Sequence, residues 1–284
     1  MGSHPARAAT FPVDLHMHST MSDGQLTPTE LVEAGAAQGL QIMSLTDHDT
    51  VAGFAEATSA AERCGIRLIP GVEISASFGR EVHLLGYFFD PENVELVAVL
   101  QARCAERVER VREICNRLSI LGCVIDPSAV LKSADGNVGR PHIARALLAA
   151  GHVRDMDHAF TKYLGDGRPA YVPASQLSIQ DAIALIHRAG GITSIAHPGV
   201  DKITHRIGEL QEMGLDAVEV EHPSHNPGMR AKLRSIVSVT GLGITGGSDL
   251  HLRDATPRFG TSGLDLDSLK RLESRVERRR EASP

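Results

Sequence analysis

The sequence contains no tryptophan, and only 4% of its 284 residues are aromatic. No apolar run reaches the roughly 20 residues that a transmembrane helix needs, which argues against a membrane protein. Basic residues are not in excess, because 29 Lys and Arg stand against 35 Asp and Glu, for a net charge of −6. An acidic chain is poorly suited to holding duplex DNA on a broad basic surface. We therefore expect neither a membrane nor duplex DNA as a partner.

Cysteine is also scarce. Cys64, Cys104, Cys115 and Cys123 do not show the spacing of a metal-binding motif. The first 12 residues lack the apolar core of a secretory signal. Reduced thiols and a cytoplasmic location are the expectation that follows.

Short runs rich in Val, Ile and Leu alternate with longer helix-like segments, which is typical of strand–helix units around a parallel sheet. Seven strands are expected, at residues 13–18, 42–46, 67–74, 82–89, 192–196, 217–221 and 243–247. Only a short turn separates the third strand from the fourth, so the regular alternation breaks there. The pattern predicts an α/β fold.

Residues 95–175 contain no strand pattern until Tyr171 and begin with a long helical segment at 95–121. We interpret them as a mostly helical insertion into a barrel formed by residues 10–94 and 176–284. The insertion carries 11 basic and 9 acidic residues, so it is the relatively basic part of an acidic chain. Because it leaves the barrel after the His83 strand, we expect it to lie near the carboxyl ends of the strands as a substrate lid.

Histidine is abundant, with 14 residues, and polar side chains gather where the expected strands end. In parallel barrels these ends build the active site. The residues concerned are Asp14, His16, His18, Asp47, His48, Asp49, Glu73, His83, His197, Glu219, Glu221, His222, Asp249 and His251.

The spacing within this set favours a metal cluster. His16 and His18 are two residues apart on an expected strand, so both side chains face the same way and can hold one ion. Asp249 and His251 repeat that spacing. Glu73 offers a carboxylate able to bridge two ions about 3.5–4 Å apart. Mixed histidine and carboxylate ligands suit zinc, manganese or iron.

These segments resemble the polymerase and histidinol phosphatase (PHP) family of metal-dependent phosphoesterases. The matching motifs are DLHMHS at 14–19, TDHD at 46–49, GVE at 71–73, His83, AHP at 196–198 and SDLH at 248–251. The resemblance implies a distorted barrel of seven βα units, the (β/α)7 barrel, that binds three divalent ions. Manganese is the expected ion, with Fe²⁺ or Zn²⁺ as alternatives.

The resemblance also implies three groups of ligands. The first ion would be held by His16, His18, Glu73 and Asp249, and the second by Glu73, His83 and His197. The third would be held by His48, His251 and Asp23, where many members of the family have histidine. Asp14 and Asp47 are expected to orient neighbouring histidines.

The insertion resembles that of a smaller subgroup of stand-alone members, through GRPHIA at 139–144, KYL at 162–164 and YVP at 171–173. This subgroup acts on small phosphorylated nucleotides, including nucleoside 3′,5′-bisphosphates, and removes 5′ nucleotides from short RNA. Arginine before a helix also suits a phosphate. The residues expected to bind substrate are Arg80, Arg140, His142, Lys162 and Ser194.

The leading hypothesis is a metal-dependent phosphomonoesterase that acts on small nucleotides, on the 5′-phosphate side of nucleoside 3′,5′-bisphosphates or at the 5′ ends of short RNA. Hydroxide held between two ions would attack phosphorus, with Glu73 as the bridging carboxylate and with His222 or His225 as proton donor or phosphate ligand. The open alternatives are a phosphatase of the histidinol-phosphate type, an amidohydrolase-like enzyme that cleaves C–N bonds, and a non-catalytic module.

Overall fold

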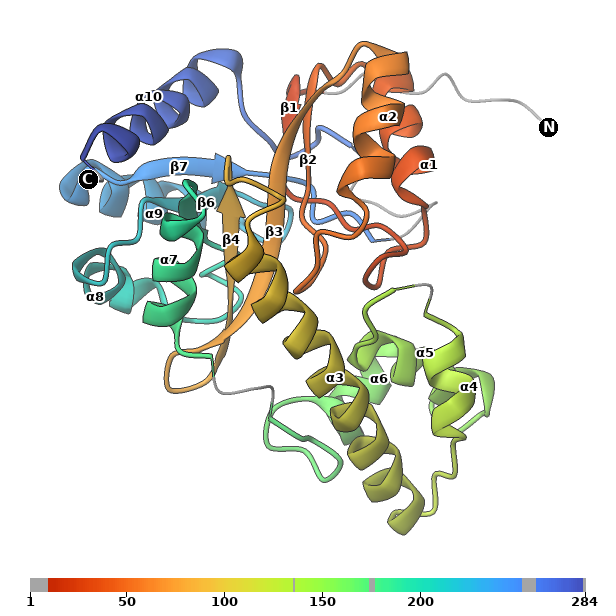
Figure 1. Cartoon of the computed structure of the whole chain (residues 1–284). Helices are drawn as coiled ribbons and strands as arrows, with labels where there is room; N and C mark the ends of the chain where they lie inside the picture. Colours follow the sequence, from red (N-terminus) through yellow and green to blue (C-terminus); the bar gives the residue numbers. More distant parts are fainter. Residues whose placement is uncertain (1–9, 135, 174–176, 252–258, 283–284) are drawn as a thin grey trace.

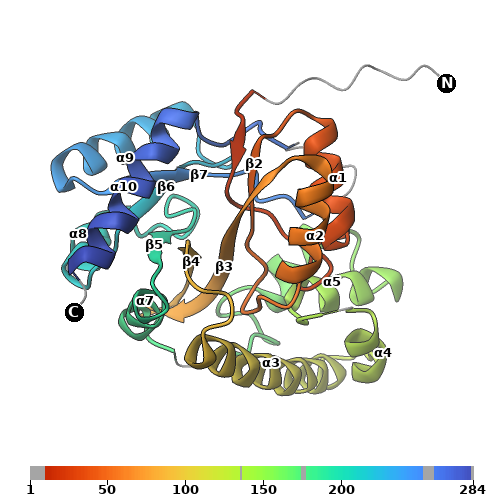
Figure 2. The same ribbon diagram turned by 45° about the horizontal axis from the view of Figure 1, so that its top comes forward.

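The computed structural model describes residues 10–134, 136–173, 177–251 and 259–282. One seven-stranded sheet is ordered from β1 to β7, and the helices lie around and beside it (Figures 1 and 2). The strands are β1 Val13–Asp14, β2 Ile42–Leu45, β3 Arg67–Ser77, β4 Glu81–Tyr87, β5 Ile192–Ile195, β6 Ala217–Glu221 and β7 Gly243–Gly246. The amide of Leu15 donates to the carbonyl of Gly246 at 3.2 Å, which brings β1 and β7 together and nearly closes the barrel.

All seven expected strands are present, and β1 and β3 differ most from the expected extent. β1 contains only Val13 and Asp14, so His16 and His18 lie beyond the regular ladder. A parallel bridge between Met17 and Leu250 still holds this segment against the one that follows β7. β3 does not end near Glu73 but continues to Ser77, because residues 71–77 pair with β4.

The fourth strand runs against the others. β4 is antiparallel to both β3 and β5, whereas the remaining strand pairs are parallel. The short turn between β3 and β4 requires this hairpin. The insertion therefore leaves the barrel at the amino ends of the parallel strands. The sequence analysis expected it near their carboxyl ends because it follows the His83 strand, and that reason is wrong.

Helix α3 (Val94–Ile120) leads the chain back toward the carboxyl ends of the parallel strands. Its 27 residues span about 40 Å, long enough to run along the whole barrel and past it (Figure 1). Leu96 and Leu100 pack into the core of the barrel. Further along α3, Ile114 and Leu118 belong to a separate hydrophobic cluster with α5 and the segments after it. The helix itself thus carries the insertion to the carboxyl ends of the strands.

The other helices are α1 Pro28–Ala37, α2 Phe54–Cys64, α4 Pro127–Lys132, α5 Arg140–Ala149, α6 Met156–Ala159, α7 Ile179–Arg188, α8 Ile207–Glu212, α9 Pro227–Thr240 and α10 Leu266–Ala282. A π-helix, η1 (Phe160–Leu164), continues α6, and a 3₁₀ turn, η2 (Thr204–Arg206), precedes α8. Thr27 caps α1 with a capping box through Glu30. No described helix is both long enough and apolar enough to span a membrane.

Candidate metal centre

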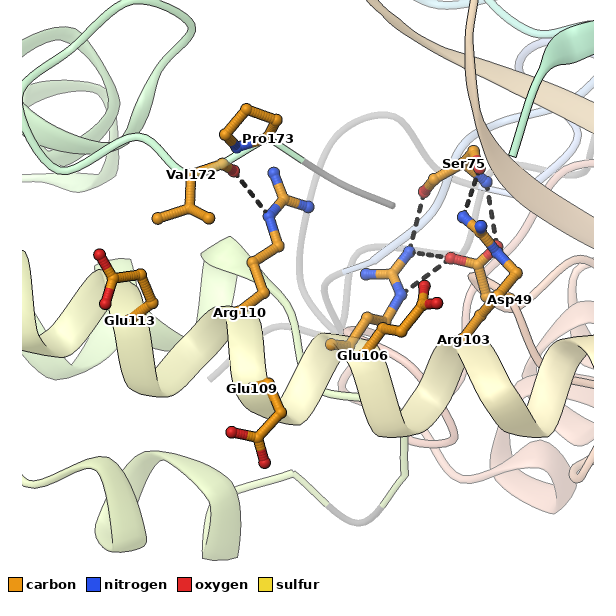
Figure 3. A pocket seen from close by; sticks show the side chains of 10 residues that line it. Asp49, Ser75, Arg103, Glu106, Glu109, Arg110, Glu113, Val172 and Pro173 are labelled. Carbon is orange, nitrogen blue, oxygen red and sulfur yellow. Dashed lines mark hydrogen bonds and ion pairs between the residues drawn. The ribbon is translucent and has the colours of Figure 1, made fainter. Parts of the chain in front are cut away.

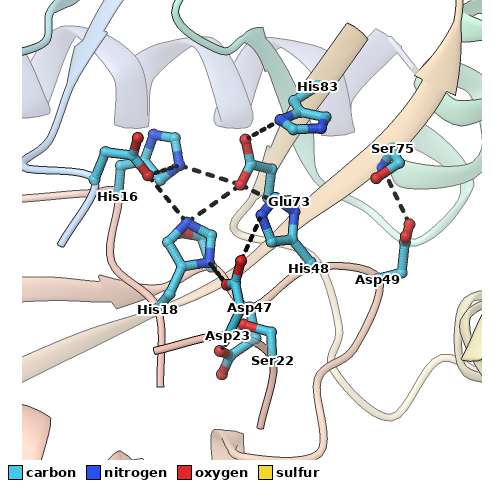
Figure 4. A network of polar contacts seen from close by, with 12 residues as sticks. His16, His18, Ser22, Asp23, Asp47, His48, Asp49, Glu73, Ser75 and His83 are labelled. Atoms are coloured by element: carbon cyan, nitrogen blue, oxygen red, sulfur yellow. Dashed lines mark hydrogen bonds and ion pairs between the residues drawn. The ribbon is translucent and has the colours of Figure 1, made fainter. Parts of the chain in front are cut away.

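Glu73 lies at the centre of a cluster of histidines (Figure 4). It reaches them from the interior of β3, and only 1% of its side chain is exposed. Its Oε2 atom lies 3.2–3.3 Å from a ring nitrogen of His16, His18 and His48. Its Oε1 atom lies 3.1 Å from His83 Nδ1 and 3.2 Å from His197 Nε2. One carboxylate thus contacts five histidines from different parts of the barrel.

The spacing of these atoms is that of ligands around small cations. His83 Nδ1 and His197 Nε2 are 3.4 Å apart, and both lie about as far from the Glu73 oxygen. Two ligands of a tetrahedral ion with bonds of 2.0–2.1 Å are separated by about 3.3 Å. Asp249 Oδ1 lies 3.3 Å from His16 Nε2 and 3.2 Å from His18 Nε2, with the same spacing.

A third group surrounds Asp23. Its Oδ1 atom lies 3.3 Å from His251 Nε2 and 3.8 Å from His18 Nδ1. Its Oδ2 atom lies 3.9 Å from His48 Nε2. The structure therefore brings together all nine residues that the sequence analysis names as ligands, with His18 and His48 each facing two groups.

Several atoms of this cluster are buried without a hydrogen bond in the described part of the chain. They are His16 Nε2, both ring nitrogens of His18, His48 Nδ1 and Asp23 Oδ1. Buried polar atoms normally have a partner, and each one left without it is destabilising. Divalent ions supply such partners, so the residues present fit a cluster of metal ions.

The carboxylates of the cluster attract positive charge. Against the effect of burial they raise the pKa of His16, His18, His83, His197 and His251, and bound ions would replace the protons that these rings hold. Burial lowers the pKa of His48 to about 3, which leaves the neutral imidazole that binds metals. Burial opposes ionisation of Glu73, but His48, His16 and His83 hold its pKa well below its usual range. The pKa of Asp249 is likewise held low against burial, chiefly by His16 and His251. Ionised carboxylates and a neutral imidazole are competent ligands.

The carboxylates that orient the histidines are not those expected from the sequence. Glu219 Oε1 lies 2.8 Å from His16 Nδ1, and its Oε2 atom accepts a hydrogen bond from the amide of His197 at 2.7 Å. Asp201 lies 3.3 Å from His197 Nδ1. Such contacts fix the orientation of a ligand ring.

Asp14 and Asp47 instead hold loops. Asp14 accepts hydrogen bonds from backbone amides, including that of Ser248 at 2.9 Å. Asp47 accepts hydrogen bonds from Ser19 and Ser22. Asp14 also accepts a hydrogen bond from the amide of His16 at 3.3 Å, so it reaches a neighbouring candidate ligand through the backbone and not through the ring. The orienting role expected for Asp47 stays a prediction.

Asp49 joins the metal-binding loops to the insertion (Figure 3). Its buried carboxylate accepts hydrogen bonds from Nε of Arg103 and of Arg107, both at 2.8 Å. The same two arginines on α3 also bind Ser75, two residues after Glu73. This network borders a cavity of about 440 Å³ and ties α3 to β3, which carries Glu73, and to the loop that carries His48. The sequence pattern places Asp49 at a strand end but gives no sign of its partners.

Replacing Asp49 with asparagine should lower the free energy of unfolding at pH 7 by about 3 kcal/mol, because two buried arginines lose their carboxylate. Burial raises the pKa of Asp49, but Arg107 and Arg103 outweigh it and lower the pKa from 3.8 to about 2. The stability that its charge provides is thus complete above about pH 4 and is lost as the pH falls through about 2.

Urea denaturation at pH 7 and at pH 3 should therefore show a smaller difference between wild type and Asp49→Asn in acid. A difference independent of pH would contradict the role given to this charge. Asp267→Asn is the control, since Asp267 is 78% exposed in a surface ion pair and its loss should change stability little.

A cavity of about 110 Å³ opens beside Asp23, His48 and His83. Three arginines line it, namely Arg107, Arg110 and Arg140. Arg110 and Arg140 flank the buried carboxylate of Glu81, at 3.0 and 2.9 Å. Arg107 and Arg110 were missed from the sequence, because only the packing of α3 shows which of its many arginines face the metal centre.

The other residues expected to bind substrate are spread more widely. Arg80 is exposed and forms an ion pair with Asp166 at 3.6 Å. His142 is buried, and its Nδ1 accepts a hydrogen bond from the amide of Gly139 at the start of α5. Lys162 is exposed above the ring of Tyr163. Ser194 is buried in β5, 2.7 Å from the hydroxyl of Thr245. None of these four lines the cavity, and their roles stay predictions.

His222 and His225 follow β6 as expected but differ in their contacts. His222 Nε2 lies 3.3 Å from Asp249 Oδ2. His225 uses both ring nitrogens in contacts with backbone groups, its Nδ1 with the carbonyl of Val220 at 3.1 Å and its Nε2 with the amide of Gly199 at 3.2 Å. Of the two, only His222 contacts a candidate ligand in the described structure.

Comparisons with known proteins agree with this geometry. A family model of the PHP domain matches residues 14–159. A 5′-3′ exoribonuclease from Haemophilus influenzae is 41% identical, over 85% of this chain and 90% of that protein. A 3′,5′-nucleoside bisphosphate phosphatase from Chromobacterium violaceum is 38% identical, over 84% and 87%. A solved metal-dependent phosphoesterase from Bifidobacterium adolescentis superposes with a TM-score of 0.85, at 32% identity over 96% and 98% of the two chains.

Proposed function

This chain belongs to the PHP domain family and is a metal-dependent phosphoesterase, and we propose that its substrate is a small phosphorylated nucleotide. The observation that carries this proposal is the position of Glu73, at the junction of five histidines beside a cavity lined by arginines. Two substrates fit best, a nucleoside 3′,5′-bisphosphate and the 5′ end of a short RNA. The relatives from C. violaceum and H. influenzae carry names of these two activities.

Three divalent ions, with manganese as the expected one, would be held by the three groups around Glu73, Asp249 and Asp23. Bound ions of this kind supply positive charge to phosphate oxygens and lower the pKa of water. The protein keeps the ligands in place: Glu219 and Asp201 fix the rings of His16 and His197. The Asp49 network holds the loop that carries His48 and the strand, β3, that carries Glu73.

The arginines of the cavity provide the remaining positive charge. Guanidinium groups bind phosphate through two parallel hydrogen bonds. Arg110 and Arg140 are held in position by Glu81, so their donors are ordered before a substrate arrives. Pre-ordered donors stabilise charge more effectively than mobile ones.

The leaving alkoxide needs a proton, and His222 is the residue proposed to hold it. Its Nδ1 accepts a hydrogen bond from the amide of Ser224 at 3.1 Å, which leaves the proton on Nε2. That atom points to Asp249, at the edge of the metal centre. His225 is less suited, since burial lowers its pKa and its ring nitrogens already contact the backbone.

The boundaries of the lid, 95–175, are part of the same proposal. The hydrophobic cluster of the insertion supports a unit that packs on itself, with Val111, Ile114 and Leu118 of α3 at its centre. Arg140 lies at the start of α5, and Glu81 connects it to β4 of the barrel. A lid in this position would cover the substrate while contributing a phosphate ligand.

Phosphate release from a set of substrates, measured with manganese-loaded protein, tests the function. The set comprises nucleoside 5′-monophosphates, 3′,5′-bisphosphates, histidinol phosphate and short RNA with a 5′ phosphate; nucleotide release is followed for the RNA. We expect kcat/KM for a bisphosphate or for RNA to exceed that for histidinol phosphate by at least about tenfold, a difference of roughly 1.4 kcal/mol. A preference for histidinol phosphate, or release of ammonia from amides without phosphatase activity, would contradict the proposal.

Asp23 provides a test of the third group of ligands. Asp23→His introduces the residue that many family members have, so metal content should be kept while the rate or the metal preference changes. Asp23→Ala removes a ligand between His251 and His48 and should lower both metal content and activity. Elemental analysis and steady-state kinetics measure the two effects. Near wild-type values for both variants would show that Asp23 binds no ion.

A further inference from the structure

A second cavity rich in arginine lies at the opposite end of the barrel from the metal centre. It measures about 520 Å³ and is formed by α9, α10 and the start of β7. Gly243 begins β7 and lines this cavity, whereas Asp249 and His251 follow the other end of that strand. Figures 1 and 2 show α9 and α10 beside β7, away from α3 and the insertion.

The arginines lie along one side of the cavity. Arg271, Arg275 and Arg278 are spaced by four and three residues on α10, so they lie on one face of the helix. Arg234 of α9 lines the same cavity. No carboxylate is among the described residues that line it. Like charges at this spacing destabilise a helix by a few tenths of a kcal/mol, so an anion bound here would relieve repulsion.

Two of the four arginines lack an acidic partner. Arg234 pairs with Glu221, and Asp265 lies near Arg271. Arg275 donates to the backbone carbonyl of Gly241, and in the described part of the chain neither it nor Arg278 forms an ion pair. Burial lowers the pKa of Arg275, and repulsion from Arg278 and Arg279 adds to this against the attraction of Asp216.

The floor of the cavity is apolar. Val237, Leu242 and Leu272 line it and are themselves at most 8% exposed. Gly243 lets Leu272 and Arg275 pack directly on the start of β7, because a Cβ atom there would lie 2.8 Å from Leu272 and 3.1 Å from Nε of Arg275. An inorganic anion would contact only the arginines and would leave this floor uncovered.

We propose that this cavity is a second binding site, which takes a nucleotide. Its phosphates would bind Arg275 and Arg278, and its base would lie on the apolar floor beside the remaining guanidinium groups. Arginine both binds phosphate and stacks on planar rings. The volume falls within the range of small-molecule sites. Because the cavity is remote from the metal centre, the bound nucleotide is a ligand there and not the molecule being hydrolysed.

Titration calorimetry with α,β-methylene-ADP, a nucleotide whose phosphates are joined by a non-hydrolysable link, tests the proposal on the manganese-loaded protein. Wild type should bind two molecules per chain. Arg278→Ala and Arg275→Gln should each weaken one of the two by about tenfold or more, the effect of losing one charge-assisted hydrogen bond. Phosphatase activity at low nucleotide concentration should stay unchanged, which separates this site from the proposed function.

Lys270→Ala is the matched control, because it removes one exposed positive charge from α10 without touching the cavity. The two binding events should be kept in that variant. Identical isotherms for Arg278→Ala and Lys270→Ala would overturn the proposal, whether wild type binds one nucleotide or two. Inorganic phosphate that binds this site as tightly as the nucleotide would also overturn it, since the apolar floor would then contribute nothing.

Discussion

Replacing Glu73 with alanine should abolish phosphate release and lower the amount of bound metal, while the barrel stays folded. The reason is geometric: its two oxygens lie 3.1–3.3 Å from five histidine nitrogens, and no other described side chain joins these groups in that way. A missing bridging carboxylate leaves neither ion properly held. Turnover, metal content by elemental analysis and circular dichroism measure the three effects.

Glu62→Ala serves as the control for this substitution, because Glu62 lies exposed on α2 and its loss should leave all three measurements unchanged. Activity of Glu73→Ala within tenfold of wild type would show that Glu73 does not bridge. If Glu73→Ala loses both its activity and its folded signal, Glu73→Gln replaces it in the test, because glutamine keeps the size of the side chain but removes its charge. Wild-type metal content in Glu73→Gln would then contradict the bridging role.

Replacing Arg140 with alanine should reduce kcat/KM for a nucleotide by roughly 10- to 150-fold, the effect of a lost charge-assisted hydrogen bond to phosphate. Arg140 lines the cavity beside His48 and His83, and 18% of its side chain is exposed. Glu81 keeps Arg110 as its partner in the variant, so the local fold should persist. Metal content should stay the same, since no ligand is removed.

An aryl phosphate separates two roles for Arg140. It lacks a base and a second phosphate, so its hydrolysis should suffer less if Arg140 contacts those groups. Equal losses on both substrates would place Arg140 on the phosphate that is cleaved, and unchanged kinetics on both would remove it from the site. Arg154→Ala is the control, because Arg154 belongs to the insertion but is 80% exposed, and its one ion pair among the described residues is with its neighbour Asp155.

The metal centre was the part of this protein most open to prediction from the sequence. Motifs such as DLHMHS at 14–19 and SDLH at 248–251 place several ligands within a few residues, and barrel topology brings the ends of strands together. The nine side chains therefore converge although β1 is shorter and β3 longer than expected. Residues beyond the ends of β1 still approach β7, because closing the sheet pairs their backbones.

Motifs and strand ends did not predict the side chains that hold other side chains in position. The sequence places Glu219 at the end of an expected strand, but its position does not predict a contact with the ring of His16. Nor does the position of Asp14 predict that it accepts hydrogen bonds from backbone amides. A carboxylate takes whichever donors the packing presents. Arg103 and Arg107 belong to a helix with many arginines, and only the crossing of α3 over the barrel selects them for Asp49.

The sequence by itself thus determined the seven strands and the gathering of histidines and carboxylates near their ends, because local periodicity and short motifs encode them. The resemblance to the family added the distorted barrel and the expected groups of metal ligands. The tertiary structure alone decided the direction of β4 and how the insertion reaches the metal centre. Because β4 is antiparallel, the chain leaves it at the amino ends of the neighbouring strands. The 27-residue helix α3 is long enough to bring the chain back to their carboxyl ends. Contacts between segments that are distant in the sequence decide the direction of β4 and the path of the insertion, and no local sequence pattern predicts those contacts.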